Sequence, residues 1–113
     1  MSKRTPQLLL EDILESSRKI LLYTDGLSFE QFLADDKTID AVIRNFEIIG
    51  EAANRLPEEI REQYSGIDWS RIKGFRNRIV HDYMGIDYKI VWLIKESFLP
   101  QLMQDVKVIL AKS

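Results

Sequence analysis

The sequence has no cysteine and only one histidine, His81. The absence of cysteine excludes disulfide bonds and metal sites built from thiolates. With a single imidazole, one chain cannot build a zinc site from several histidines either. The 113 residues include only five glycines and three prolines, so few positions force a turn. This composition favours long helices over many short strands.

No apolar run approaches the length that a membrane-spanning helix needs. Near the N-terminus, the leucines at 8–10 are followed at once by Glu11 and Asp12, which does not fit a signal peptide. We therefore expect a cytoplasmic protein with no membrane partner. With 45% hydrophobic and 30% charged residues, the composition is typical of one folded domain over residues 1–113.

Helix start signals recur along the first half of the chain. Thr5 and Pro6 predict the start of a first helix that ends near residues 25–26, and Ser28 with Gln31 predicts a capping box for a short second one. A third helix is expected to begin near Thr38 or Asp40, with an apolar stripe that ends at Ala53. A short helical segment is predicted over 58–64.

Two more long helices are predicted in the second half. Asp68 is a suitable cap for a helix that reaches about Met84, with Gly85 placed to end it. Asp87 caps a last helix that extends to about residue 110, and Pro100 inside it should kink it or split it in two. Together these signals predict an all-α, up-and-down bundle of four main helices plus short helical segments.

The last predicted helix has two apolar faces. The first consists of Val91, Ile94, Phe98, Leu102, Val106 and Ile109, and the second of Trp92, Leu99, Met103 and Leu110. A helix that is apolar on two sides must bury both of them. We therefore expect the second face to meet another subunit in a symmetric homodimer.

Basic residues gather in one part of an otherwise acidic chain. The net charge of −2 argues mildly against a large nucleic-acid-binding surface. Between residues 68 and 82, however, Arg71, Lys73, Arg76 and Arg78 occur with no acid among them. On charge alone, a solvated helix face is the simpler interpretation of this cluster, and an RNA-binding surface is the alternative.

Arg76 and His81 are the best candidates for chemistry in this region. On the predicted helix, Asn77 and His81 are four residues apart and share a face, and Tyr83 lies two turns from Arg76. The last helical turn would favour the imidazolium form of His81. An imidazole can move protons at the attacking or leaving oxygen of a phosphodiester, while a guanidinium neutralises the charge that develops on phosphate. A purely structural histidine is the alternative, but Arg76 interrupts an apolar stripe, and such misfits tend to mark function.

The order of these residues also resembles a known signature. Arg76, four residues, His81, one residue and Tyr83 resemble the motif of HepT-like proteins of the HEPN superfamily, and Asn77 directly after the arginine is part of that motif. The resemblance continues at 45–53, 69–74 and 84–92, and it covers roughly residues 5–110. It implies a HEPN-like helical fold.

The resemblance implies the toxin subunit of a type VII-like toxin–antitoxin module. Such a subunit is a metal-independent endoribonuclease that acts as a homodimer on RNA and needs no cofactor. Arg76 and His81 would be the catalytic residues, Asn77 would position them, and Arg71, Lys73 and Arg78 would contact RNA. An MntA-like minimal nucleotidyltransferase, the antitoxin partner, would transfer AMP from ATP to Tyr83 and silence the toxin.

Other readings of the sequence stay open. Glu47 and Glu51 lie four apart on one helix face, but no histidine is near them in sequence, so we expect no metal there. Glu51 is instead expected to orient Arg76 or a neighbour by a charge-assisted hydrogen bond. The alternative function is a non-catalytic helical module that binds a nucleotidyltransferase or a nucleotide through the same basic cleft. A plain interaction bundle is the third.

Overall fold

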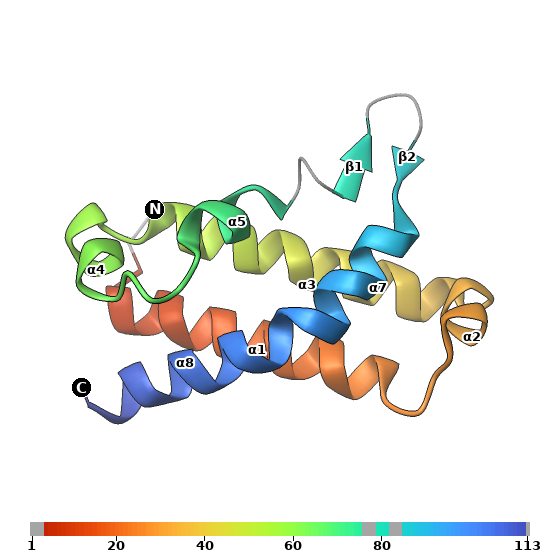
Figure 1. Cartoon of the computed structure of the whole chain (residues 1–113), viewed down its shortest axis with the longest axis horizontal. Coiled ribbons are helices and arrows are strands. Elements are labelled where there is room, and N and C mark those ends of the chain that lie inside the picture. Colours follow the sequence, from red (N-terminus) through yellow and green to blue (C-terminus); the bar gives the residue numbers. More distant parts are fainter. Residues whose placement is uncertain (1–3, 76–78, 82–84, 113) are drawn as a thin grey trace.

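The computed structural model in Figure 1 describes residues 4–75, 79–81 and 85–112, with the backbone alone at Val80 and His81. Its helices in chain order are α1 (Pro6–Thr24), α2 (Phe29–Leu33), α3 (Asp36–Arg55), α4 (Glu58–Gln63), α5 (Trp69–Lys73), α7 (Tyr88–Ser97) and α8 (Leu99–Ala111). Two short strands, β1 (Val80–His81) and β2 (Gly85–Ile86), lie between α5 and α7. The described residues thus confirm the all-α prediction, with one small strand pair added.

The helix caps explain most of these boundaries. The Thr5 hydroxyl accepts a hydrogen bond from the Leu8 N–H at 3.2 Å, and Pro6 follows at the first helical position, as predicted. Ser28 and Gln31 form the predicted capping box of α2. The start of α3 was predicted a few residues too late, because Asp35 is its cap and accepts from the Thr38 N–H at 3.1 Å.

Helix α1 lies at the centre of the bundle and packs along both α3 and α8. In Figure 1, α1 runs away from the two termini, while α3 and the pair α7–α8 run back toward them. Each long helix contributes a buried apolar face, with members such as Ile13 and Ile20 in α1, Phe46 and Ile49 in α3, and Val106 in α8. Burying one such side chain stabilises the fold by about 1.5–3 kcal/mol.

Gly50 allows α5 to approach α3 closely. A Cβ added at Gly50 would lie 3.4 Å from the Ile72 carbonyl oxygen, at the short end of normal contact. A glycine at this position therefore permits the close approach. The contact helps to fix the position of α5, which carries Arg71 and Lys73.

The helix predicted from 69 to 84 does not run as one helix to its expected end. Helix α5 ends at Lys73, where Gly74 forms its C-cap, and Val80–His81 is a strand, although Phe75 and Ile79 are again helical. The β-branched Val80 favours extended backbone. Gly85, expected to end a helix, instead has a φ of 77° at the start of β2. A periodic apolar pattern did not reveal that Val80 pairs with Ile86.

Pro100 splits the last predicted helix in two, as expected. Helix α7 ends at Ser97 and α8 begins at Leu99, so that Pro100 lies in the first turn of α8. In the first turn the missing proline N–H costs no helical hydrogen bond. Phe98 is the residue between the two helices.

This break overturns the reason given for a homodimer. Leu99, assigned to the exposed second face, is fully buried within its own chain. Trp92 packs against Phe29 and Phe32 of α2, with ring centroids 5.9 and 5.1 Å apart. Met103 and Leu110 are partly exposed. Because Leu99 is buried and Trp92 packs against α2, the four residues do not form one continuous exposed apolar face.

Candidate functional site

The strand pair β1–β2 positions the backbone of the single histidine. The strands are antiparallel, and Val80 lies opposite Ile86 and His81 opposite Gly85. The Asp87 N–H donates to the Ile79 carbonyl oxygen at 2.7 Å and closes the ladder next to α7. In Figure 1 the pair projects from the helices, away from the end that carries the termini.

Four of the predicted site residues fall outside the described residues. These are Arg76, Asn77, Arg78 and Tyr83, and for His81 only the backbone is described. The prediction that residue 81 lies in a final helical turn is wrong, because that residue lies in a strand. The shared helical face proposed for residues 77 and 81, and the dipole effect on the imidazole, therefore do not apply.

Buried residues lie on both sides of the arginines at 76 and 78. Phe75 is fully buried and contacts Phe46 and Phe98 edge-to-face, with ring centroids 5.4 and 5.8 Å apart. Edge-to-face aromatic pairs add about 0.5–1.5 kcal/mol beyond the burial of their area. Ile79 is 2% exposed. The chain is thus attached to the core immediately before Arg76 and immediately after Arg78.

Arg71, predicted to contact RNA, is half-buried against an aromatic ring. Its guanidinium carbon lies 4.5 Å from the centroid of the Phe98 ring, a cation–π geometry. Within the described part of the chain its buried Nε has no hydrogen-bond partner. Lys73, in contrast, is exposed. Of these two residues of the basic cluster, Lys73 is therefore the more open to solvent.

A cavity of about 440 Å³ lies beside Lys73 on the surface of α3. Its lining is polar on the side of α3 and consists of Phe46, Glu47, Gly50, Glu51, Asn54 and Lys73. The sequence predicted neither Asn54 nor the approach of Lys73 to the two glutamates. Among the described residues, no three histidine, cysteine or acidic side chains gather in a way that could hold a metal ion.

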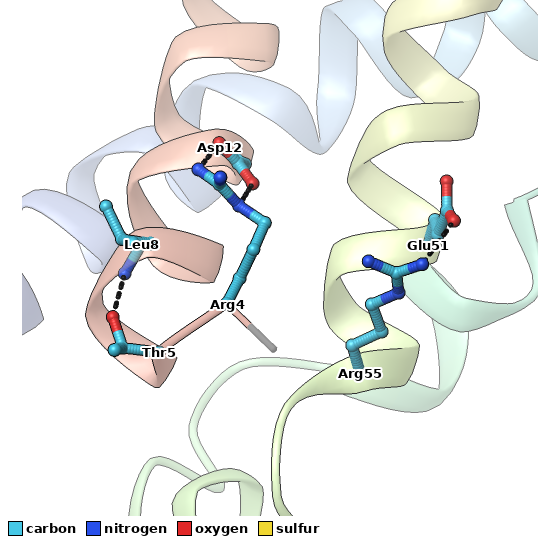
Figure 2. A network of polar contacts seen from close by, with 6 residues as sticks. All are labelled: Arg4, Thr5, Leu8, Asp12, Glu51 and Arg55. Atoms are coloured by element: carbon cyan, nitrogen blue, oxygen red, sulfur yellow. Dashed lines mark hydrogen bonds and ion pairs between the residues drawn. The ribbon is translucent and has the colours of Figure 1, made fainter. Parts of the chain in front are cut away.

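Glu51 forms an ion pair with Arg55 one turn along α3, at 3.2 Å. Figure 2 shows this pair facing Arg4, which binds Asp12 of α1 through two hydrogen bonds of 2.7 and 2.9 Å. A hollow of about 350 Å³ lies between the two pairs. Each guanidinium there already has a carboxylate, so the hollow has no uncompensated charge. The predicted bond from Glu51 to Arg76 stays a prediction.

A second cavity, which we call the hairpin cavity, lies where α2, β2 and α7 meet. It has a volume of about 460 Å³ and is lined by Phe29, Leu33, Gly85, Ile86, Asp87, Tyr88 and Lys89. No role was predicted for Phe29 or Tyr88 from the sequence. A tyrosine directly after the Asp87 cap could have indicated an exposed aromatic at the start of a helix, but no neighbouring residue indicated that α2 would face it.

None of the described helices is both long enough and apolar enough to cross a bilayer.

The chain is similar to known proteins over nearly its whole length. The family model for ribonuclease HepT-like proteins matches residues 13–109. A candidate RNase of Caldanaerobacter subterraneus subsp. tengcongensis is 40% identical over 111 residues, which cover 96% of this chain and 97% of the relative. A candidate RNase of Methanocaldococcus jannaschii is 36% identical over 97% of this chain and 91% of its own.

A third relative carries the family name itself. A candidate ribonuclease HepT of Thermococcus cleftensis is 37% identical over 100 residues, which cover 88% of this chain and 91% of the relative. No solved structure matches the chain significantly.

Proposed function

The chain belongs to the ribonuclease HepT-like family, and from this premise we propose that it is a metal-independent endoribonuclease, the toxin of a type VII-like toxin–antitoxin module. The observation that carries the proposal is the match to relatives named as RNases over more than nine-tenths of the chain. Within the chain, the basic stretch 71–78 leads directly to the strand of the only histidine.

In this proposal His81 and Arg76 share the chemistry. The ribose 2′-hydroxyl attacks the neighbouring phosphorus, and its proton passes to a base as the new P–O bond forms. The bond to the 5′-oxygen breaks, and that oxygen takes up a proton, which leaves a 2′,3′-cyclic phosphate. The His81 imidazole transfers protons, and the Arg76 guanidinium neutralises charge on the phosphate oxygens. Asn77 positions these groups, with Glu51 in support, and Lys73, Arg71 and Arg78 contact the RNA backbone.

The test is cleavage of a labelled RNA by purified protein. His81→Ala and Arg76→Ala should each lower the cleavage rate by about a hundredfold or more, as the loss of one charge-stabilising donor typically does. Cleavage by the wild type should persist in EDTA. Arg44→Ala, which changes an exposed arginine of α3, is the control and should cleave normally. Full activity of both site variants would overturn the assignment and favour the non-catalytic alternative.

We further propose that Tyr83 is the acceptor for AMP from an MntA-like minimal nucleotidyltransferase. A phosphate and a purine on this side chain would occupy the place of RNA near Arg76. Co-expression with the nucleotidyltransferase should add the mass of AMP, and Tyr83→Phe should prevent the addition. Tyr88→Phe, at an exposed tyrosine nearby, should not. An AMP adduct that persists in Tyr83→Phe would refute the proposal.

We propose that the functional unit is a homodimer, on the basis of two exposed apolar side chains in the C-terminal helices. Leu93 of α7 and Val108 of α8 are 58% and 52% exposed, the most open apolar side chains of the C-terminal helices. Light scattering should give the mass of a dimer at micromolar concentration, and Leu93→Asp should shift it toward the monomer. A monomeric wild type would contradict the dimer.

A further inference from the structure

The hairpin cavity is open to solvent and is not used by the proposed cleavage chemistry. Leu33 and Tyr88 in its lining are 41% and 36% exposed. Large apolar side chains left open around a concave space commonly mark a binding site. We propose that this cavity holds one unpaired base of the RNA substrate. The inference rests on the proposed function, because it names the part of the RNA that this region recognises.

The chemistry of the lining fits a nucleobase. A base has two flat apolar faces and a polar edge, and proteins bind unpaired bases by stacking them on aromatic side chains. The cavity has aromatic residues from two different elements, Phe29 of α2 and Tyr88 of α7, and aliphatic ones in Leu33 and Ile86. Lys89 adds a cation that can contact the phosphate attached to a bound base.

The walls of the cavity are held in place without a ligand. Phe29 begins α2 directly after the Ser28 cap and packs against Trp92, which lies beneath the Lys95 ammonium at 3.5 Å from the ring centroid. Tyr88 begins α7, whose cap accepts from the Ile90 N–H at 3.2 Å. Because these elements are already ordered, binding a base costs little conformational entropy at the walls.

The position of the cavity favours RNA over a peptide. Gly85 and Ile86 line the cavity and pair directly with His81 and Val80. A base held there brings the adjoining phosphodiester to the strand of the proposed catalytic histidine. The basic stretch 71–78 leads into the same strand pair, which suits a polyanion. The cavity would thus set which nucleotide lies next to the cleaved bond.

The experiment measures the Kd of a labelled single-stranded RNA by fluorescence anisotropy, using full-length protein. A series of RNAs, each with one abasic position, should contain one that binds about tenfold or more weakly. Tyr88→Ala should weaken binding of the intact RNA by a similar factor. This variant should bind the intact RNA and that abasic RNA with equal affinity. Tyr88→Phe keeps the ring and should bind normally. Tyr23→Ala, at a tyrosine of α1 with similar exposure of 39%, is the matched control.

Cleavage of the same RNA is followed in parallel, so that the two proposals fail differently. If the wild type cleaves but neither Tyr88→Ala nor any abasic position changes binding, the base site is wrong and the proposed function stands. If Tyr88→Ala and one abasic position weaken binding and their effects are not additive, but no cleavage occurs, the base site stands and the proposed nuclease activity is wrong. Equal loss in Tyr23→Ala, or a wild type that does not bind RNA, also overturns the base site.

Discussion

In the helical body formed by α1, α3 and α8, whole faces of aliphatic and aromatic side chains are buried against one another. In the segment 74–87, which joins α5 to α7, only two described side chains are fully buried, Phe75 and Ile79. Its described backbone also includes a short strand pair, next to which the Asp87 N–H donates a hydrogen bond to the Ile79 carbonyl oxygen. The proposed catalytic residues all belong to this second region.

From this comparison we expect stability and the proposed chemistry to depend on different parts of the molecule. Substitutions in the body should lower the free energy of unfolding, while substitutions of the motif residues should lower activity and leave stability nearly unchanged. Four predictions test this division, beginning with the residue that should break it.

Phe75 lies in the segment but should behave as a residue of the body. Its ring is fully buried between Phe46 and Phe98, so Phe75→Ala should lower the free energy of unfolding by about 3–5 kcal/mol. Urea denaturation monitored by circular dichroism measures this loss. Phe75→Leu should retain most of the stability. A loss below about 1 kcal/mol for Phe75→Ala would mean that the segment is not attached to the core there.

Trp92 tests the packing of α7 against α2. Trp92→Ala removes contacts to Phe29, Phe32 and Lys95 and should lower the free energy of unfolding by about 2 kcal/mol, less than for a fully buried tryptophan. As a control, Leu22→Ala changes a side chain of α1 that is 57% exposed and should change the free energy of unfolding by less than about 0.5 kcal/mol. If Trp92→Ala altered only the oligomeric mass, the ring would face a partner instead.

A substitution at Gly85 should destabilise only the segment 74–87. Its φ of 77° lies in the left-handed region, where a side chain costs about 1–2 kcal/mol. Gly85→Ala should therefore speed hydrogen exchange at the Asp87 N–H while exchange in α1 and α3 stays unchanged. Gly66→Ala, at a glycine with open space and no such φ, is the control. Slower or equal exchange at Asp87 in Gly85→Ala would contradict this account of the strand pair.

The smallest effect concerns acid and the cap of α3. Hydrogen bonds from the Thr38 hydroxyl and the Thr38 N–H lower the pKa of Asp35. A carboxyl whose pKa is lower in the folded state stabilises the fold above its unfolded pKa, and this contribution is lost as the pH falls through the folded value. Stability of the wild type should thus decrease below about pH 4, and Asp35→Asn should reduce that decrease. Asp40→Asn, an exposed position of α3, serves as the control in thermal melts at each pH.

Local signals predicted the caps well because a cap depends on residues within one helical turn. Thr5, Ser28, Asp68 and Asp87 all act as predicted. The strand pair could not be predicted in this way. Its stability depends on the pairing of Val80 with Ile86, six residues later, and the apolar spacing around 79–80 fits a helix equally well.

The candidate site shows the same limit. Its residues could be proposed from their order in the sequence, but the predicted helix gave His81 the wrong backbone conformation. The prediction of a second apolar face on the last helix was wrong for a related reason. It applied helical spacing across residues 92–110 as if they formed one helix, whereas α7 ends at Ser97 and α8 begins at Leu99. In the structure Leu99 is buried, and Trp92 packs against Phe29 and Phe32 of α2. Which distant element covers a side chain is not encoded in its immediate neighbours.

The attachment of Ile79 and Ile86 to the core has a consequence for how this family can vary. Closing a chain between two fixed points costs loop-closure entropy that rises only slowly with length, by about 0.6 kcal/mol for each doubling. Because the core holds the chain at Ile79 and again at Ile86 and α7, inserting a residue or two among 82–84, between the paired strands, should cost the fold little. We therefore expect the chain length there to be set by the proposed roles of His81 and Tyr83, and relatives that change it should be screened for activity before stability.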